Sequence, residues 1–114
     1  MSLVTHIVCF KYKPTASDAE RHLVASKILA LQDQCQIDGS TYLTVTGGSN
    51  NSTEGLTKGF DHAFVFNFSS TKHRDYYCDD DPAHQAFKAF CKDFVEDVFV
   101  FDFAGGEFFE HCDL

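Results

Sequence analysis

A ten-residue stretch near the middle of the chain, residues 59–68, constrains the fold more than any other. Every even position from 60 to 68 carries phenylalanine except for His62, and the odd positions from 61 to 67 are mixed. Because side chains alternate across a β-strand, this segment has one aromatic face and one mixed face. Such a strand is typical of a sheet that helices cover on its aromatic side. His62 is the one polar residue on that face, and it is therefore the first candidate for chemistry.

Hydrophobic periodicity predicts the other elements. Apolar residues alternate over 3–12, 41–46 and 97–103, which predicts three further strands. A helical stripe begins near Ala16 and ends near Cys35. A short helical turn is expected from Ser69 or Ser70 to Tyr76. Residues 79–81 are all aspartate and precede Pro82, which predicts the capped start of a second long helix.

The predicted order, β-α-β-β-α-β, favours an α+β fold of the ferredoxin-like type. In this fold a four-stranded antiparallel sheet carries two helices on one face. Residues 1–114 are expected to form one domain, in which 104–114 is a tail whose Phe108 and Phe109 dock on the rest. Three of the strands are apolar on both faces, and two helices cover only one of them. We therefore expect a homodimer in which the two open sheet faces close into a barrel-like core.

Composition excludes several classes of function. The net charge is −8, which repels phosphate backbones and anionic lipids, so neither nucleic-acid nor membrane binding is expected. No apolar run approaches the roughly 20 residues that span a bilayer, and no signal peptide is recognisable. Five cysteines without CxxC spacing fit reduced thiols, which favours a cytoplasmic location.

Several separated motifs, in the same order along the chain, carry a resemblance to a known family. They are Thr5–Lys11, Gly59–His62, Asp75–Tyr77, Asp81–His84 and Phe101–Phe103. The chain resembles the stress-responsive dimeric A/B-barrel family over nearly its whole length. That family is similar in fold to cofactor-free monooxygenases and to the plant enzyme olivetolic acid cyclase.

The resemblance implies a pocket between the sheet and the helices. In cyclase-type members it holds a first-strand His, a third-strand His, a Tyr and a helix His. The first two correspond here to His6 and His62, and the helix His to His84. The Tyr is either Tyr77, which fits the spacing of the family pattern, or Tyr76, which fits the preceding Asp. Asp81 stands where the pattern has the first His of His-Pro-x-His.

These residues suggest acid–base chemistry without a cofactor. His84 is the expected general base, because a histidine near neutrality suits proton abstraction beside a carbonyl. The acidic residues before it raise its pKa, while burial and the helix N-terminus lower it. Tyr76 or Tyr77 would donate to the developing enolate. No metal is expected, because the histidines lack the spacing of a helical metal site.

His6 and His62 are expected to orient the substrate. They lie on equivalent faces of two strands expected to be neighbours, and side chains placed opposite each other would line one cavity with His84. Phe64 and Phe87 would form its walls. The ligand would be an apolar small molecule, such as a polyketide-like carbonyl compound.

Three functions remain open from the sequence. The first is a cyclase or lyase, the second a non-catalytic ligand carrier or stress-protective dimer, and the third a cofactor-free monooxygenase. A cavity that brings His84 and a tyrosine hydroxyl to a common point would favour catalysis. A cavity filled by Phe64, Phe66 or Phe87 would favour the non-catalytic protein.

Overall fold

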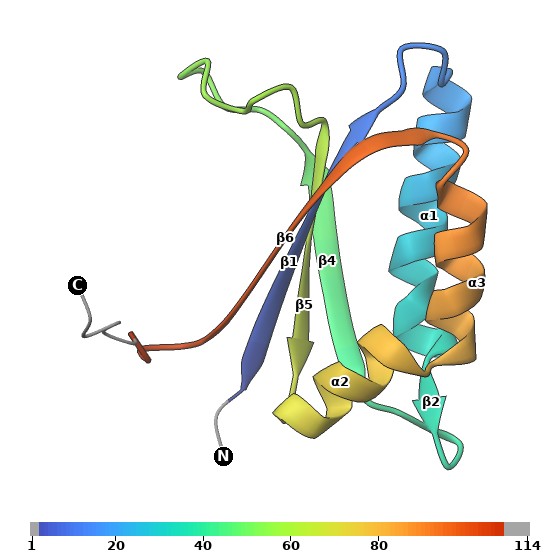
Figure 1. Ribbon diagram of the computed structural model, residues 1–114, viewed down its shortest axis with the longest axis vertical. Helices are drawn as coiled ribbons and strands as arrows, with labels where there is room; N and C mark the ends of the chain where they lie inside the picture. The colour runs from blue at the N-terminus through green and yellow to red at the C-terminus, as the bar shows by residue number, and fades with distance from the viewer. Residues whose placement is uncertain (1–2, 109–114) are drawn as a thin grey trace.

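Residues 3–108 are described by a computed structural model (Figure 1). Its elements in chain order are β1 (Val4–Tyr12), α1 (Asp18–Gln34), β2 (Gln36–Ile37), β3 (Ser40–Thr41), β4 (Leu43–Ser49), β5 (His62–Phe68), α2 (Thr71–Asp79), α3 (Pro82–Cys91) and β6 (Val95–Ala104). Four strands form one antiparallel sheet in the order β4-β5-β1-β6. The predicted α+β, ferredoxin-like fold is confirmed.

The structure differs from the predicted elements between α1 and β5. Asp38 and Gly39 both have positive φ, of 51° and 79°, and they close a short hairpin of β2 and β3. Asp-Gly is a strong signal for such a turn, whereas the helical periodicity predicts only that a helix ends before it. The next strand therefore begins at Leu43 and runs to Ser49, beyond the predicted 41–46.

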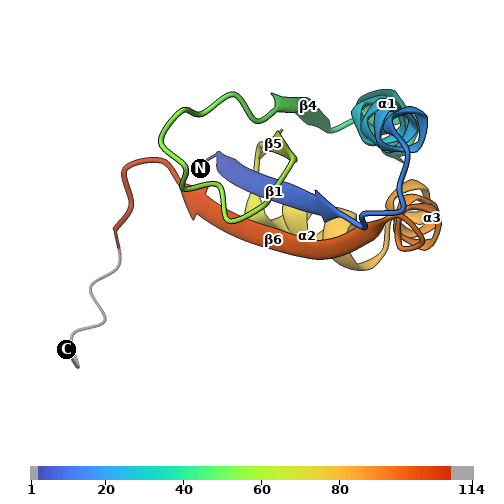
Figure 2. The same ribbon diagram turned by 90° about the horizontal axis from the view of Figure 1, so that it is seen from above.

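The helices gather on one side of the sheet (Figure 2). The even-numbered residues of β1 and β5 face this side, and nearly all of them are buried. Phe64, Phe66 and Phe68 are at most 1% exposed. From α1, Val24, Ile28 and Leu31 complete the layer. The core is thus an aromatic layer between one face of the sheet and the helices.

The other sheet face is not covered by any element within residues 3–108. On β6 the side chains of Phe99, Phe101 and Phe103 are between 41% and 53% exposed. Phe108 is 88% exposed, so the expectation that it docks is wrong for the protomer. Phe109 lies outside the described residues.

Gly47 lets β4 approach the aromatic layer closely. A Cβ on Gly47 would lie 2.4 Å from Cδ1 of Phe64 and 2.6 Å from the carbonyl oxygen of Ala63. The next residue, Gly48, has open space at the same position. Only the first of the two glycines is therefore required for packing.

We expect Gly47→Ala to lower the free energy of unfolding by about 1–3 kcal/mol, because a methyl group there must displace both a buried ring and the neighbouring strand. Gly48→Ala is the matched control and should change stability by less than about 0.5 kcal/mol. Urea unfolding of the two variants measures the difference. Equal stabilities would contradict the close packing at Gly47.

Candidate functional site

Three of the predicted site residues come together at one end of the aromatic layer. His84 on α3 stacks on the ring of Tyr77 on α2, with centroids 3.8 Å apart and an interplanar angle of 11°. His6 on β1 meets the same tyrosine edge to face at 5.9 Å. We call these three residues the histidine–tyrosine cluster.

A buried carboxylate fixes the start of α3 and hence the position of His84. Asp81 is 1% exposed, and one of its oxygens accepts a hydrogen bond from the backbone N–H of Ala83 at 2.9 Å. Its other oxygen accepts from the hydroxyl of Tyr42 at 2.6 Å. Asp81 therefore caps the helix from within the fold.

His84 is held in one tautomer. Its Nδ1–H donates to the backbone carbonyl of Tyr77 at 2.7 Å, which leaves a lone pair on Nε2. Burial lowers the pKa of His84 to about 4 and outweighs the opposing effect of this hydrogen bond. The imidazole is therefore neutral at pH 7, and Nε2 is an acceptor.

His6 is anchored by charged residues that the sequence analysis missed. Its Nδ1 lies 2.6 Å from Oδ1 of Asp102 on β6, and Oδ2 of Asp102 accepts from Arg74 at 3.0 Å. Arg74 on α2 also donates to Asp75 at 2.8 Å. The sequence contained one sign of this role. Asp102 is a polar residue in an otherwise apolar strand, and it lies on the side of the strand that faces the helices.

The remaining polar atoms of this cluster have no partner among residues 3–108. Within residues 3–108, the Tyr77 hydroxyl and Nε2 of His6 make no hydrogen bond. Every side-chain nitrogen or oxygen in this range that is fully enclosed does have a hydrogen-bond partner. Both atoms must therefore reach accessible space, although Tyr77 is only 1% exposed. Burial also raises the pKa of Tyr77, so its hydroxyl keeps its proton and is a donor.

Tyr76 turns away from the cluster. Its ring packs edge to face on Tyr42, with centroids 5.8 Å apart. Of the two tyrosines left open by the sequence, Tyr77 is the one beside His84. The helical phase decides this, because consecutive residues of α2 point in directions about 100° apart.

His62 does not join His6 and His84. The register pairs His6 with Phe66 and His62 with Phe10, so the two histidines share a face but lie four residues apart along the strands, about 13 Å. The expectation that they lie opposite each other is therefore wrong. The space between them is filled by core side chains, among them Phe64 and Phe87, which are 1% and 6% exposed.

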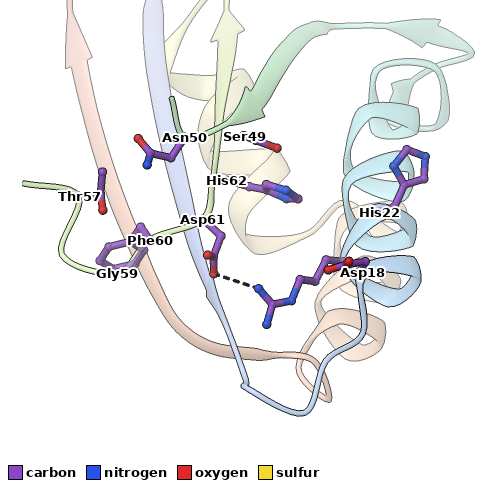
Figure 3. A pocket seen from close by; sticks show the side chains of 10 residues that line it. Asp18, His22, Ser49, Asn50, Thr57, Gly59, Phe60, Asp61 and His62 are labelled. Carbon is purple, nitrogen blue, oxygen red and sulfur yellow. Dashed lines mark ion pairs between the residues drawn. The ribbon is translucent and has the colours of Figure 1, made fainter. Parts of the chain in front are cut away.

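His62 instead lines a polar pocket of about 470 Å³ at the other end of the sheet (Figure 3). The pocket lies between the β4–β5 loop and the start of α1. The hydroxyl of Tyr12 is 2.9 Å from Nδ1 of His62, and Asp61 lies 3.8 Å from Arg21. Tyr12 was not among the predicted site residues.

Neither a metal cluster nor a membrane span is found in the described part of the chain. Within residues 3–108, no three His, Cys, Asp or Glu side chains are grouped closely enough to hold a metal ion. No helix in that range is long and apolar enough to cross a bilayer.

The low pKa of His84 predicts a loss of stability in mild acid. The unfolded chain takes up a proton near pH 6.5, whereas the folded chain does so only near pH 4. The stability contribution is therefore present above pH 6.5 and is lost as the pH falls towards 4. After allowance for partial exposure, this amounts to about 1–2 kcal/mol.

Urea unfolding of the wild type and of His84→Asn at several pH values tests this. The difference in unfolding free energy between the two proteins should be constant above pH 7 and should shift in favour of the variant from pH 6.5 to 4. A constant difference over the whole range would show that His84 is not buried as a neutral group.

Comparisons with known proteins extend this description. Residues 4–104 match the Stress responsive A/B Barrel Domain family. No curated protein matches the chain. Among solved structures, a hydroxynitrile lyase from Passiflora edulis has a TM-score of 0.80 at 20% identity, with 96% of this chain and 98% of that chain covered.

Two further solved structures are similar in fold. A protein from Arabidopsis thaliana has a TM-score of 0.75 at 20% identity, with 94% and 99% of the two chains covered. A dimeric ferredoxin-like protein from Thermobifida fusca has a TM-score of 0.67 at 20% identity, with 90% and 91% covered. Identities this low establish the fold alone. With its family match over residues 4–104, the chain belongs to the stress-responsive A/B barrel domain family.

Proposed function

We propose that the protein is a cofactor-free lyase or cyclase that acts on a small carbonyl compound at the histidine–tyrosine cluster. The observation that carries the proposal is the convergence of a neutral imidazole, a protonated phenol and a second, anchored imidazole in one place.

The cysteines of the protein at positions 9, 35, 78 and 91 are free thiols, which supports a cytoplasmic location.

The cluster residues have distinct roles in this proposal. Nε2 of His84 takes a proton from the hydroxyl group or the acidic carbon of the substrate. The Tyr77 hydroxyl donates a hydrogen bond to the oxygen on which negative charge develops. Asp102 accepts the Nδ1–H of His6, so His6 presents Nε2 to the substrate and orients it.

Two observations favour a small substrate over a long polyketide chain. The centre of the layer between sheet and helices is occupied by Phe64, Phe66 and Phe87, so no continuous cavity extends from the cluster to His62. The similarity in fold to a hydroxynitrile lyase supports a lyase reaction on a short carbonyl derivative, although only by analogy.

The same filled core favours a second candidate, a non-catalytic carrier or stress-protective dimer. In that reading the cluster binds a ligand but does not convert it. The two functions differ in one measurable property, which is turnover.

We expect Tyr77→Phe and His84→Ala to lower kcat/KM by at least about 100-fold on the substrates that the wild type converts, because each removes a group that moves or stabilises a proton. The assay is a panel of cyanohydrins and keto compounds. Tyr76→Phe is the matched control, since the ring of Tyr76 packs on Tyr42 and not on His84, and it should retain wild-type kinetics.

The outcomes separate the candidates. Equal conversion by the wild type and both cluster variants would contradict the proposed residue roles. Ligand binding without conversion by any of the proteins would favour the carrier.

We also propose that two copies of the chain associate through the open sheet face. On this face the exposed rings of Phe99 and Phe101 stack with centroids 6.3 Å apart, and Phe60 meets Phe99 at 6.4 Å. Exposed aromatic patches of this kind mark protein interfaces. The dimeric state of the Thermobifida protein is consistent with this.

Phe101→Lys should convert the dimer to a monomer at micromolar concentration, because it places a charge in the centre of the apolar face. Val100→Lys is the matched control. It has nearly the same exposure, 52% against 53%, but lies on the helix-facing side of β6. Sedimentation velocity measures both variants, and a wild-type monomer under the same conditions would rule out the interface.

A further inference from the structure

The polar pocket beside His62 is separate from the histidine–tyrosine cluster. It lies at the opposite end of the sheet, where the β4–β5 loop faces the first turns of α1. Its volume of about 470 Å³ is within the roughly 300–1,000 Å³ that small-molecule sites occupy. None of the roles proposed for His6, Tyr77 or His84 uses this space.

His62 lines the pocket, and the buried Tyr12 behind it fixes how its ring is protonated. Tyr12 is 3% exposed, and within residues 3–108 its hydroxyl has only Nδ1 of His62 as a hydrogen-bond partner. Burial raises the pKa of Tyr12 and lowers that of His62, so both are neutral at pH 7. The Tyr12 hydroxyl then donates to Nδ1, and His62 carries its proton on Nε2 as a donor.

The guanidinium group of Arg21 is already committed to the fold. Its Nε and Nη2 donate to the backbone carbonyls of Ala16 and Lys13, at 3.0 and 3.2 Å. Its Nη1 faces the Asp61 carboxylate at 3.8 Å, the contact drawn as a dashed line in Figure 3. Few N–H donors of the Arg21 guanidinium are therefore left free to bind a carboxylate or phosphate group of a ligand.

The charges around the pocket therefore select against an anionic ligand. Asp18 and Asp61 contribute two carboxylates, against the guanidinium of Arg21 and the imidazole of His22. A cationic ligand would meet that guanidinium between the carboxylates. Hydroxyl groups from Ser49 and Thr57 offer both donors and acceptors, which an uncharged polar ligand uses best.

Phe60 borders the pocket, and its ring packs edge to face on Phe99, 6.4 Å away on the open face of the sheet. The groups that face a ligand beside His62 are therefore mainly polar, and hydroxyl groups on the ligand can pair with them.

We propose that this pocket binds an uncharged, hydroxyl-rich small molecule of about monosaccharide size, with the Nε2–H of His62 donating to one of its oxygens. The proposal does not depend on the function proposed for the histidine–tyrosine cluster. The two sites use different residues at opposite ends of the sheet.

Titrations of the ¹⁵N-labelled full chain, followed by backbone amide shifts, test the proposal. Glucose and myo-inositol are the uncharged probes, inorganic phosphate is the anionic probe and ethanolamine is the cationic probe. We expect saturable shifts at Thr57 and His62 with at least one of the two polyols. Saturable shifts with phosphate or ethanolamine, or none with either polyol, would overturn the proposal.

A pair of Tyr→Phe variants then tests the role of His62. Tyr12→Phe removes the partner that fixes the His62 tautomer and should weaken polyol binding by about five-fold or more, the loss of one hydrogen bond. Tyr42→Phe is the matched control, because it removes a hydroxyl that is also hydrogen-bonded, to Asp81, at a site remote from the pocket. It should bind as the wild type does.

A second variant keeps the test decisive if Tyr12→Phe does not fold. Thr57→Val removes only a hydroxyl group, on a loop outside the aromatic core, and should also weaken polyol binding. Wild-type affinity in a folded Tyr12→Phe protein, or in Thr57→Val if that variant has to be used, would overturn the assigned contacts.

Discussion

The packing of one aromatic layer between the sheet and its helices is the interaction on which the rest of the structure depends. The three phenylalanines of β5 are almost fully buried in it, and each contributes about 2–3 kcal/mol of hydrophobic free energy. Because this layer is close-packed, it leaves polar side chains only at its two ends. The histidine–tyrosine cluster lies at one end and the pocket of His62 at the other.

The antiparallel register keeps the polar residues at the two ends of this layer apart. His6 and His62 each stand opposite a phenylalanine of the neighbouring strand, and never opposite each other. At one end, burial raises the pKa of Tyr77 and lowers that of His84. The other end is open and polar, and a protonated ring nitrogen faces accessible space there.

The sequence predicted what depends on local pattern. Alternation and helical periodicity gave the strand and helix order, and the resemblance gave Tyr77 and His84 as partners within a set that still contained Tyr76. The choice between the tyrosines needed the phase of α2, which its cap at Ser70 sets. The distance between His6 and His62 depends on the register of β1 against β5. That register cannot be predicted from either strand segment alone.

The missed residues share one property, which is long sequence separation from their partners. Asp102 is 96 residues from His6, and Tyr12 is 50 residues from His62. A polar residue on an apolar strand signals that some partner exists, and only the folded chain shows which one. Arg74 illustrates this, because it lies on a helix with no apolar pattern and still donates to Asp102 near the end of β6.

The exposed apolar residues of β6 affect how readily the protein aggregates in the cell. This strand forms the border of the sheet and exposes large apolar side chains on both of its faces, which is the profile of an aggregation-prone segment. Until another surface covers it, this strand therefore makes a newly synthesised protomer prone to aggregate. In the proposed dimer the second copy would cover this strand, so dissociation on dilution would expose it again.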